Sequence, residues 1–259
     1  MVIDLLFLDR FIYSKLQKIV GVRMQIQDGF SWTLLKPFNL QKDLETKRHV
    51  MIECNAKLGI AFEVMDECFQ PVYHDRRNKR NMIKDIICNC DVSKAPLSSM
   101  SLILKSLKGM GRPWLYIFVT ISFVKLSIRS NYKRLNFSGF YTVILEREDE
   151  IVAAATIRVH GNKLAEMPFF GTRNLYRGQG MARRLLNSVE SILFTVGVKE
   201  LVVVAIPDVV KMWKVGFGFK PLEASMRRDI KPMGLVMFEG KPILQKRIPP
   251  TTNKDLSVR

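Results

Sequence analysis

The stretch Arg177-Gly178-Gln179-Gly180-Met181-Ala182 fits the spacing Arg/Gln-x-x-Gly-x-Gly/Ala and lies between a strand-like run and a helix-like run. The preceding run, 164–170, is mostly apolar and ends at Gly171. In the following run, apolar residues recur at intervals of three and four, which predicts an amphipathic helix; they are Met181, Leu185, Leu186, Val189, Ile192 and Leu193. A strand that turns through glycines into a helix presents unpaired backbone N–H groups, which favour a bound anion. Since glycine has no Cβ, the stretch predicts a site for a pyrophosphate-bearing cofactor.

The alternative interpretation of this stretch is a solvated turn with a helix cap, because Arg-Gly-x-Gly is a short and common pattern. Two other phosphate-binding motifs are excluded. The dinucleotide fingerprint Gly-x-Gly-x-x-Gly is absent, and no Gly-Lys-Ser/Thr follows the glycines as in a Walker A loop.

The neighbouring segments support a binding loop. Residues 201–206 form a continuous, mostly β-branched run, which is typical of a strand buried on both faces. Pro207-Asp208 ends that strand and begins a second predicted helix with an apolar side, which stops at Gly216-Phe217-Gly218-Phe219. Upstream, 140–145 and 151–159 predict an antiparallel hairpin with its turn at 148–150.

The order strand, glycine loop, helix, buried strand, short helix and Gly-Phe resembles the Gcn5-related N-acetyltransferase (GNAT) superfamily over roughly residues 139–246. In that superfamily the loop holds the pyrophosphate of acetyl-coenzyme A. The resemblance implies an α+β class, a three-layer α/β arrangement of the GNAT-like acyl-CoA N-acyltransferase fold. Its central sheet would be mixed, mostly antiparallel and flanked by helices.

Several separated blocks also resemble the acetyltransferase region of plant PHD-finger proteins, the Increased DNA Methylation histone acetyltransferase group. These blocks, in the same order, are 13–17, 29–35, 65–69, 137–142, 164–169 and 217–222. The PHD zinc fingers of such proteins are not in this chain.

These resemblances imply a set of site residues. The residues expected to bind the cofactor acetyl-CoA are Phe170, Gly171, Arg177, Gly178, Gln179, Gly180, Met181, Ala182 and Trp213. Trp213 is expected to be a core or coenzyme-flanking aromatic rather than a catalyst. By the superfamily pattern, backbone N–H groups of 166–171 polarise the acetyl carbonyl, where the strand splays from its neighbour at Pro168 or Gly171.

Glu166 is the expected catalytic residue. Its block matches the strand that carries the general base in Gcn5-like histone acetyltransferases, and it lies eleven residues before Arg177. A carboxylate beside the groove can take the proton of the acceptor ammonium. The alternative is an ordinary strand glutamate on the solvent face. The tyrosine that often protonates the leaving thiolate is replaced by Lys214, so Lys214, solvent or no acid at all remain open for that step.

Composition sets the organisation. A chain of 259 residues with 47% apolar content can bury one sizeable core with an appendage, or two small ones. We expect a mainly helical flanking region at 1–90, a GNAT-like core at 131–246 and a polar tail at 247–259. Residues 91–130 are an atypical apolar insertion, either a genuine extra element or translated non-coding sequence.

Cysteine usage and charge bear on the compartment. Four cysteines at irregular spacing indicate reduced thiols in a cytosolic or nuclear protein, and the Cys88-Asn89-Cys90 spacing is poor for zinc, so no metal is expected. No secretory signal and no membrane-spanning run is predicted. The net charge of +17 supports a nuclear location and nucleic acid as a partner only weakly, since the cations are spread along the chain.

The predicted function is acetyl-CoA-dependent acetylation of a protein amine, a histone tail above all, in chromatin regulation. Two alternatives stay open. A catalytically weak or inactive module could serve as a corepressor or chromatin scaffold, and a small-molecule N-acetyltransferase would use the same cofactor loop.

Overall fold

The structure is a computed structural model that describes residues 2–38, 48–70, 73–75, 80–88, 137, 139–238 and 240–248. The predicted insertion at 91–130 lies outside the described residues, as does most of the predicted tail at 247–259.

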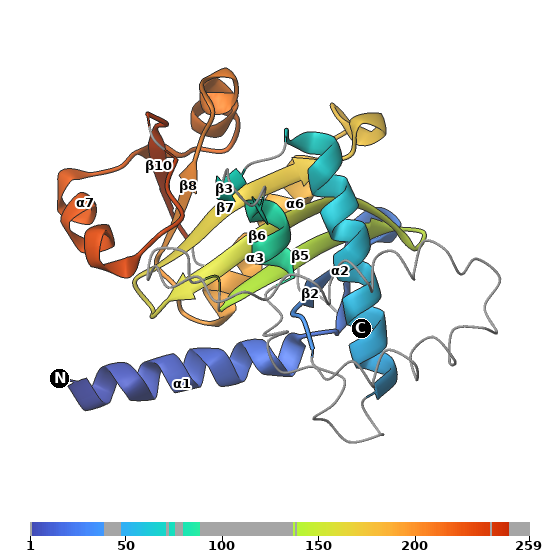
Figure 1. The fold of residues 1–259 in the computed structure, drawn as a ribbon, viewed down its shortest axis with the longest axis horizontal. Coiled ribbons are helices and arrows are strands. Elements are labelled where there is room, and N and C mark those ends of the chain that lie inside the picture. The colour runs from blue at the N-terminus through green and yellow to red at the C-terminus, as the bar shows by residue number, and fades with distance from the viewer. Residues whose placement is uncertain are drawn as a thin grey trace.

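An eight-stranded sheet in the order β1-β2-β5-β6-β7-β8-β10-β9 forms the centre of the molecule (Figure 1). Its strands are β1 (Arg23–Gln25), β2 (Phe30–Leu35), β5 (Phe140–Arg147), β6 (Glu150–His160), β7 (Leu164–Thr172), β8 (Glu200–Val204), β9 (Lys220–Pro221) and β10 (Ile243–Arg247). All neighbouring pairs are antiparallel except β7 and β8, which are parallel. A separate pair, β3 (Tyr73–Asp75) and β4 (Arg80–Asn81), is antiparallel.

Helices cover both faces of the sheet (Figure 1). They are α1 (Val2–Ile19), α2 (Arg48–Cys68), α3 (Met82–Ile87), α6 (Met181–Thr195) and α7 (Ala224–Ile230). The predicted α+β class, with a mixed, mostly antiparallel sheet flanked by helices in the GNAT-like arrangement, is confirmed.

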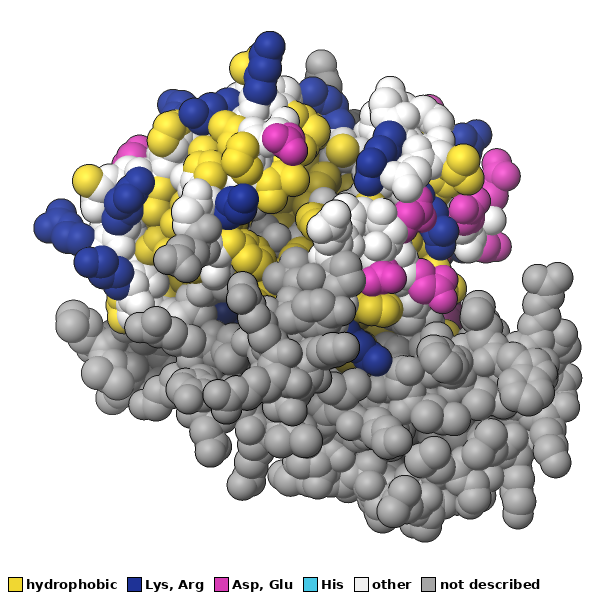
Figure 2. All heavy atoms as spheres, turned by 45° about the horizontal axis from the view of Figure 1, so that its top comes forward, with side chains coloured by type: hydrophobic (Ala, Val, Ile, Leu, Met, Phe, Trp, Pro, Cys, Tyr) yellow, Lys and Arg dark blue, Asp and Glu magenta, His cyan; other side chains and the backbone are white. Residues whose placement is uncertain are grey.

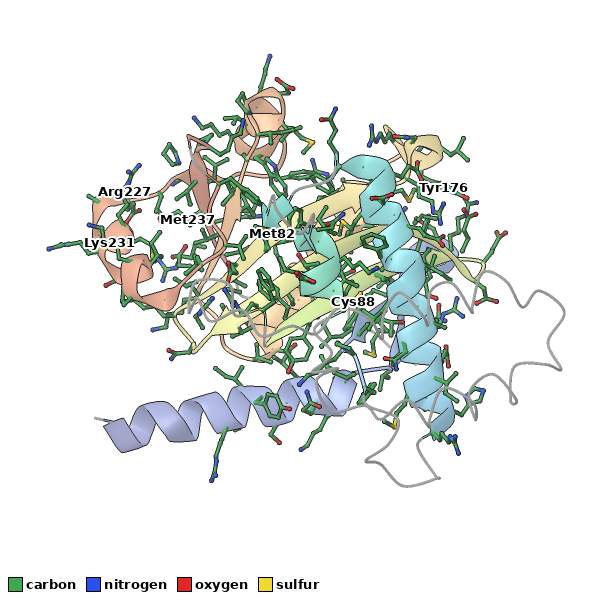
Figure 3. The ribbon with its side chains drawn as sticks, viewed as in Figure 1. Met82, Cys88, Tyr176, Arg227, Lys231 and Met237 are labelled. Carbon is green, nitrogen blue, oxygen red and sulfur yellow. The ribbon has the colours of Figure 1, made fainter. Side chains whose placement is uncertain are left out.

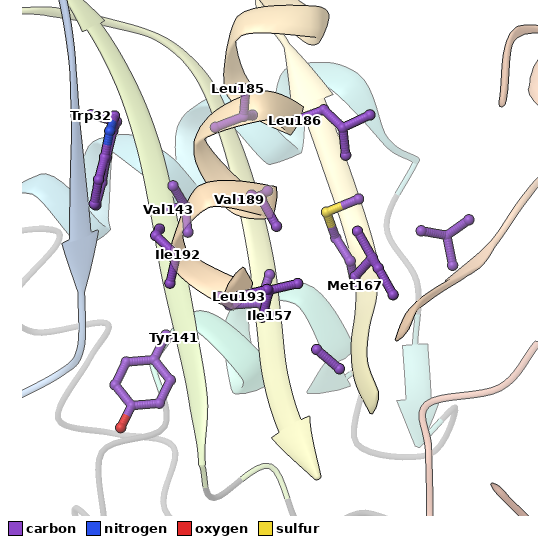
Figure 4. Close-up of a cluster of buried hydrophobic side chains, with 14 of the residues drawn as sticks. Trp32, Tyr141, Val143, Ile157, Met167, Leu185, Leu186, Val189, Ile192 and Leu193 are labelled. Atoms are coloured by element: carbon purple, nitrogen blue, oxygen red, sulfur yellow. The ribbon is translucent and has the colours of Figure 1, made fainter. Parts of the chain in front are cut away.

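The crossover helix α6 makes the main core with one face of the sheet. Its buried residues repeat at three- and four-residue intervals and pack on alternate residues of β5, β6 and β7 (Figure 4). The labelled members of this cluster are Trp32, Tyr141, Val143, Ile157, Met167, Leu185, Leu186, Val189, Ile192 and Leu193. At about 25 cal/mol per Å² of buried apolar surface, such a face is the main stabilising contribution to the fold.

A second core lies on the opposite face, under α2 and α3, and a third, smaller one lies under α7. The α7 core joins Leu164 of β7 and Val202 of β8 to Leu222, Ile230 and Leu235. The face of β7 that carries Leu164 is therefore covered by α7 at one end and by α2 and α3 at the other, and these helices are far apart in the chain.

The described part of the 1–90 region is mainly helical, as expected, but it also contributes β1 and β2, which extend the same sheet beside β5. All six residues of β2 are buried, including Ser31 and Thr33, so both faces of the strand are covered although its residues alternate between apolar and polar from Phe30 to Leu34. The predicted second helix is instead a 3₁₀ turn (Pro207–Val209) followed by a π-helical turn (Met212–Gly216).

Candidate functional site

Strand β7 separates from β8 halfway along its length. The parallel pairing runs from Leu164 opposite Glu200 to Met167 opposite Val203 and ends there, whereas β7 keeps its antiparallel partner β6 as far as Thr172. Between Glu166 and Phe169 the register shifts, so β7 carries one residue more than β6 over this interval. Pro168, which has no N–H, lies in this bulge. The two strands thus diverge at Pro168, one of the two positions at which the sequence predicts it.

The glycine loop follows the diverged end of β7. A 3₁₀ turn (Asn174–Tyr176) leads into Gly178 and Gly180, whose φ angles are 76° and 83°. A Cβ added at either glycine would meet nothing within 4 Å. Gly180 is the N-cap of α6 and supplies no side-chain acceptor to the helix. The left-handed backbone and the open space explain why glycine stands at both positions.

The backbone amides of this loop face no protein acceptor in the part of the chain that the structure describes. The first recorded helical bond of α6 runs from the Arg184 amide to the Gly180 carbonyl, 3.1 Å away, and none is recorded for the amides of 178–183. A helix start with free amides carries a partial positive charge and binds anions. The loop therefore has the geometry of an anion cradle.

Cationic side chains surround the loop. Arg177 is exposed and donates from Nε to the Thr172 carbonyl at 3.3 Å. Arg183 donates to the Gly216 carbonyl at 2.9 Å and so ties the first turn of α6 to the π-helical turn. The Gln179 side chain donates to the Leu175 carbonyl at 2.8 Å, and this bond stabilises the conformation of the loop.

An aromatic cluster lies next to the loop. Phe170 packs edge-on against Trp213 with ring centroids 5.3 Å apart, and Trp213 also contacts Phe217 and Phe219. Trp213 is 5% exposed, so it is a core aromatic, one of the two roles expected for it. Its neighbour Lys214 is exposed.

The remaining cofactor-binding candidates contribute in different ways. The Met181 side chain is buried in the main core and Ala182 is half-buried, so both residues present backbone groups to the loop rather than side chains. A Cβ at Gly171 would lie 2.8 Å from Cys68 Sγ and 3.0 Å from its Cβ. Gly171 therefore faces α2, and close packing explains the glycine without any ligand.

Glu166 lies toward the other end of β7 and is 3% exposed. Its Oε1 accepts from Arg158 at 2.6 Å and lies 2.8 Å from His160 Nε2, while Oε2 accepts from the Val236 amide at 2.7 Å. The alternative of a solvent-facing strand glutamate is wrong. Both carboxylate oxygens are engaged inside the protein, so Glu166 forms the centre of a buried polar cluster.

Arg158 joins this cluster to the covering segment. Its Nη2 donates to the Gly234 carbonyl at 2.9 Å, and its guanidinium lies 4.4 Å from the centre of the Phe140 ring. Together with the Val236 amide, these contacts hold residues 234–236 against the sheet. We name the group Arg158, His160, Glu166 and the 234–236 backbone the carboxylate cluster.

Sequence reasoning found the loop and Glu166 but missed Arg158, His160 and the Val236 amide. Gly161-Asn162-Lys163 is the turn between β6 and β7 and sets Arg158 opposite Glu166, so a hairpin register counted from it would have found Arg158. Nothing local predicts Val236, which comes from 70 residues away along the chain.

Hydrophobic side chains gather in a hollow on the face shown in Figure 2, with Lys and Arg side chains around them. Exposed apolar residues close in sequence to the site include Ile206, two residues after β8, and Met237, directly after the carboxylate cluster. Arg227 and Lys231 point outward on the α7 side, whereas Tyr176 lies at the opposite side beside the glycine loop (Figure 3).

Two further features concern the described residues alone. Among them, no group of three His, Cys, Asp or Glu side chains is arranged to hold a metal ion. None of the helices within the described ranges has the length and apolar character needed to cross a bilayer.

Solved structures similar to this one are acetyltransferases. Gcn5 of Tetrahymena is 15% identical with a TM-score of 0.42, over 67% of this chain and 91% of that one. A GNAT family acetyltransferase from Elizabethkingia anophelis with acetyl-CoA bound is 14% identical with a TM-score of 0.34, over 42% of this chain and 77% of that one. Values this low assign no activity.

Sequence comparison is more specific. Residues 119–247 match the family described as Increased DNA methylation 1, C-terminal domain. The chain is also 33% identical over 239 residues to Increased DNA methylation 1 of Arabidopsis thaliana, and this match covers 92% of the chain. The chain spans 17% of the length of that relative. Both matches carry the same family description.

Proposed function

We propose that this chain binds acetyl-CoA at the loop 177–182 and transfers the acetyl group to a protein amine, with histone lysines as the expected acceptors. The observation that carries this proposal is that, within the described residues, the amides of 178–183 have no protein acceptor, and that they follow the end of β7 that has separated from β8. Backbone amides at a helix start suit a diphosphate, and the family match is consistent with a chromatin setting and a nuclear location.

The protein groups divide the work by position. The amides of Gly178, Gln179 and Gly180 would hold the diphosphate, with Arg177 adding positive charge. Beyond Met167, β7 is no longer paired with β8, and backbone N–H groups of this segment would polarise a thioester carbonyl. The coenzyme itself supplies the activated acetyl group. Lys214, exposed beside Trp213, remains a candidate to protonate the leaving sulfur.

A second function is favoured by one specific observation. Both oxygens of Glu166 are already bonded to Arg158, His160 and the Val236 amide, and a carboxylate in this state offers little to an acceptor amine. A chain that holds coenzyme weakly and acts as a scaffold for chromatin or corepressor proteins would tolerate this arrangement.

Isothermal titration with acetyl-CoA separates these possibilities. We expect saturable binding of acetyl-CoA and none of a phosphate-free acetyl thioester, because the cradle recognises phosphate. Turnover is then measured with recombinant core histones and with spermidine as a small amine. Acetylation of histones alone supports the protein acceptor, acetylation of spermidine alone supports a small-molecule enzyme, and binding without turnover supports the scaffold. Absence of binding contradicts the proposal.

A further inference from the structure

The carboxylate cluster contains a titratable group that the GNAT resemblance does not use. His160 is the last residue of β6, and its side chain is 15% exposed while that of Glu166 is 4% exposed. Its Nε2 lies 2.8 Å from Glu166 Oε1. Of the two residues, His160 is the one that solvent or an acceptor can reach.

The contact with Glu166 determines which nitrogen of His160 carries hydrogen. A carboxylate that faces a guanidinium accepts hydrogen bonds and donates none, and Glu166 Oε1 also accepts from Arg158 at 2.6 Å. The hydrogen of a neutral imidazole therefore stands on Nε2. The lone pair is left on Nδ1, for which no protein partner is recorded among the described residues.

This arrangement has the features of an oriented base. A carboxylate that holds one nitrogen of a histidine fixes its tautomer and stabilises the imidazolium that forms when the other nitrogen takes a proton. Arg158 fixes the carboxylate in turn, through Nε and Nη2. Lys163 and Asp229, also at this end of the sheet, pair with each other at 2.6 Å and so compensate one another, while Glu200 lies opposite Leu164 on β8 and Arg247 opposite Glu200 on β10.

We propose, on the basis of the proposed acetyltransferase function, that His160 is the proton acceptor of the reaction and that Glu166 and Arg158 are its positioning residues. His160 Nδ1 takes one proton from the acceptor ammonium, which frees the nitrogen lone pair. The amine nitrogen then forms a bond to the acetyl carbonyl carbon as the carbon–sulfur bond breaks. The second amine proton ends on the released thiolate, and the imidazolium returns its proton to solvent.

The substitution His160→Gln tests this directly, because a glutamine can keep the hydrogen bond to Glu166 but cannot accept the proton. General base catalysis contributes about 100-fold to 10,000-fold, so we expect kcat on core histones to fall by at least about 100-fold with an unchanged Kd for acetyl-CoA. The acid limb of the kcat/KM–pH profile is expected to disappear, because the variant lacks the base whose protonation would produce it. Added imidazole is expected to restore part of the activity of His160→Ala. Arg158→Lys keeps the charge but loses the two-nitrogen contact, and is expected to lower kcat without changing KM.

His49→Gln is the matched control, since His49 is exposed on the first turn of α2. It is expected to leave kcat and the pH profile unchanged. The chain has three histidines, so ¹⁵N NMR can identify the His160 tautomer independently of turnover, and hydrogen on Nδ1 instead of Nε2 overturns the proposal. Wild-type activity with an unaffected His160→Gln variant overturns this proposal alone, whereas a wild-type chain that turns over no acceptor overturns the proposed function with it.

Discussion

The two ends of β7 differ in how their polar groups are satisfied. At the Glu166 end, each carboxylate oxygen has a protein partner between 2.6 and 2.8 Å away, and the side chain is buried. At the Thr172 end, the strand leads into exposed glycines, and the amides of 178–183 have no protein acceptor in the part of the chain that the structure describes. One strand therefore has a closed end at Glu166, where the polar groups are paired within the protein, and an open end at Thr172, where the amides that follow are exposed.

Residues at the closed end stabilise the fold, whereas residues at the open end are available to bind a ligand. Closing a buried polar group with protein partners stabilises the native state, because an unpaired one is costly. Leaving exposed amides free costs little in water, and they become useful when an anion binds. The closed end should therefore respond to substitution in stability, and the open end in binding.

The largest effect is expected from Glu166→Gln. The substitution leaves the Arg158 guanidinium buried without its counter-charge, and removing one partner of a buried ion pair costs about 3–5 kcal/mol. Urea unfolding monitored by circular dichroism measures this loss. Restoring stability with the double substitution Glu166→Gln and Arg158→Met is expected, because no uncompensated charge then remains.

The control for this experiment is Asp229→Asn. The Lys163–Asp229 pair has a similar distance but side chains that are 50% and 38% exposed, and exposed pairs contribute about 0–1 kcal/mol. Equal stability of the Glu166→Gln and Asp229→Asn variants would show that the ion pair does not hold the closed end. It also follows that lost activity in Glu166→Gln cannot by itself identify a catalytic base.

The next largest effect is expected at the open end, from Gly180→Asp. The new carboxylate would stand where a phosphate binds, and two like charges about 5 Å apart cost about 3 kcal/mol at an effective dielectric constant of about 20. That corresponds to roughly a hundredfold rise in the Kd for acetyl-CoA, measured by calorimetry.

Gly197→Asp provides a matched control at the other end of α6. Gly197 also has a positive φ, of 79°, and open space around it, so the same backbone strain arises far from the loop. The control variant is expected to lose similar stability and to keep the affinity of the wild type. Equal affinity of the two variants for acetyl-CoA would show that the loop amides do not bind the coenzyme.

The comparison also explains what the sequence could predict. Local patterns predicted β7, α6 and the glycine loop, because turns and periodicities are set by neighbours in the chain. The loop glycines could be identified for the same reason, whereas the divergence of β7 at Pro168 or Gly171 was implied by the superfamily resemblance. Arg158 and His160 required the register of a hairpin, and the Val236 amide required a contact across 70 residues, which no local pattern contains. Gly171 looked like part of the loop, yet it is glycine because Cys68 of α2 lies against it.

The smallest expected effect is on the reactivity of the Cys68 thiol. It tests whether a ligand bound at the open end changes the electrostatic environment of a half-buried residue. Cys68 lies where β7 leads into the loop, with Sγ 3.1 Å from the Thr172 carbonyl. Burial raises the pKa of the Cys68 thiol, and the nearby Arg177 guanidinium lowers it by less. Because only the thiolate reacts, alkylation of Cys68 by iodoacetamide is expected to be slow at neutral pH and to accelerate as the pH rises.

Acetyl-CoA is expected to slow this alkylation by roughly twofold to tenfold, since phosphates beside Arg177 cancel part of the charge that favours the thiolate and one pKa unit is tenfold in thiolate. Arg177→Gln should slow the reaction in the same direction without ligand. Mass spectrometry of the labelled peptides separates Cys68 from Cys54, which is 2% exposed and whose pKa burial raises to about 11. Cys54 is therefore expected to react only when the chain unfolds. An alkylation rate of Cys68 that is indifferent to both acetyl-CoA and Arg177 would mean that the diphosphate, if it binds, does so away from this loop.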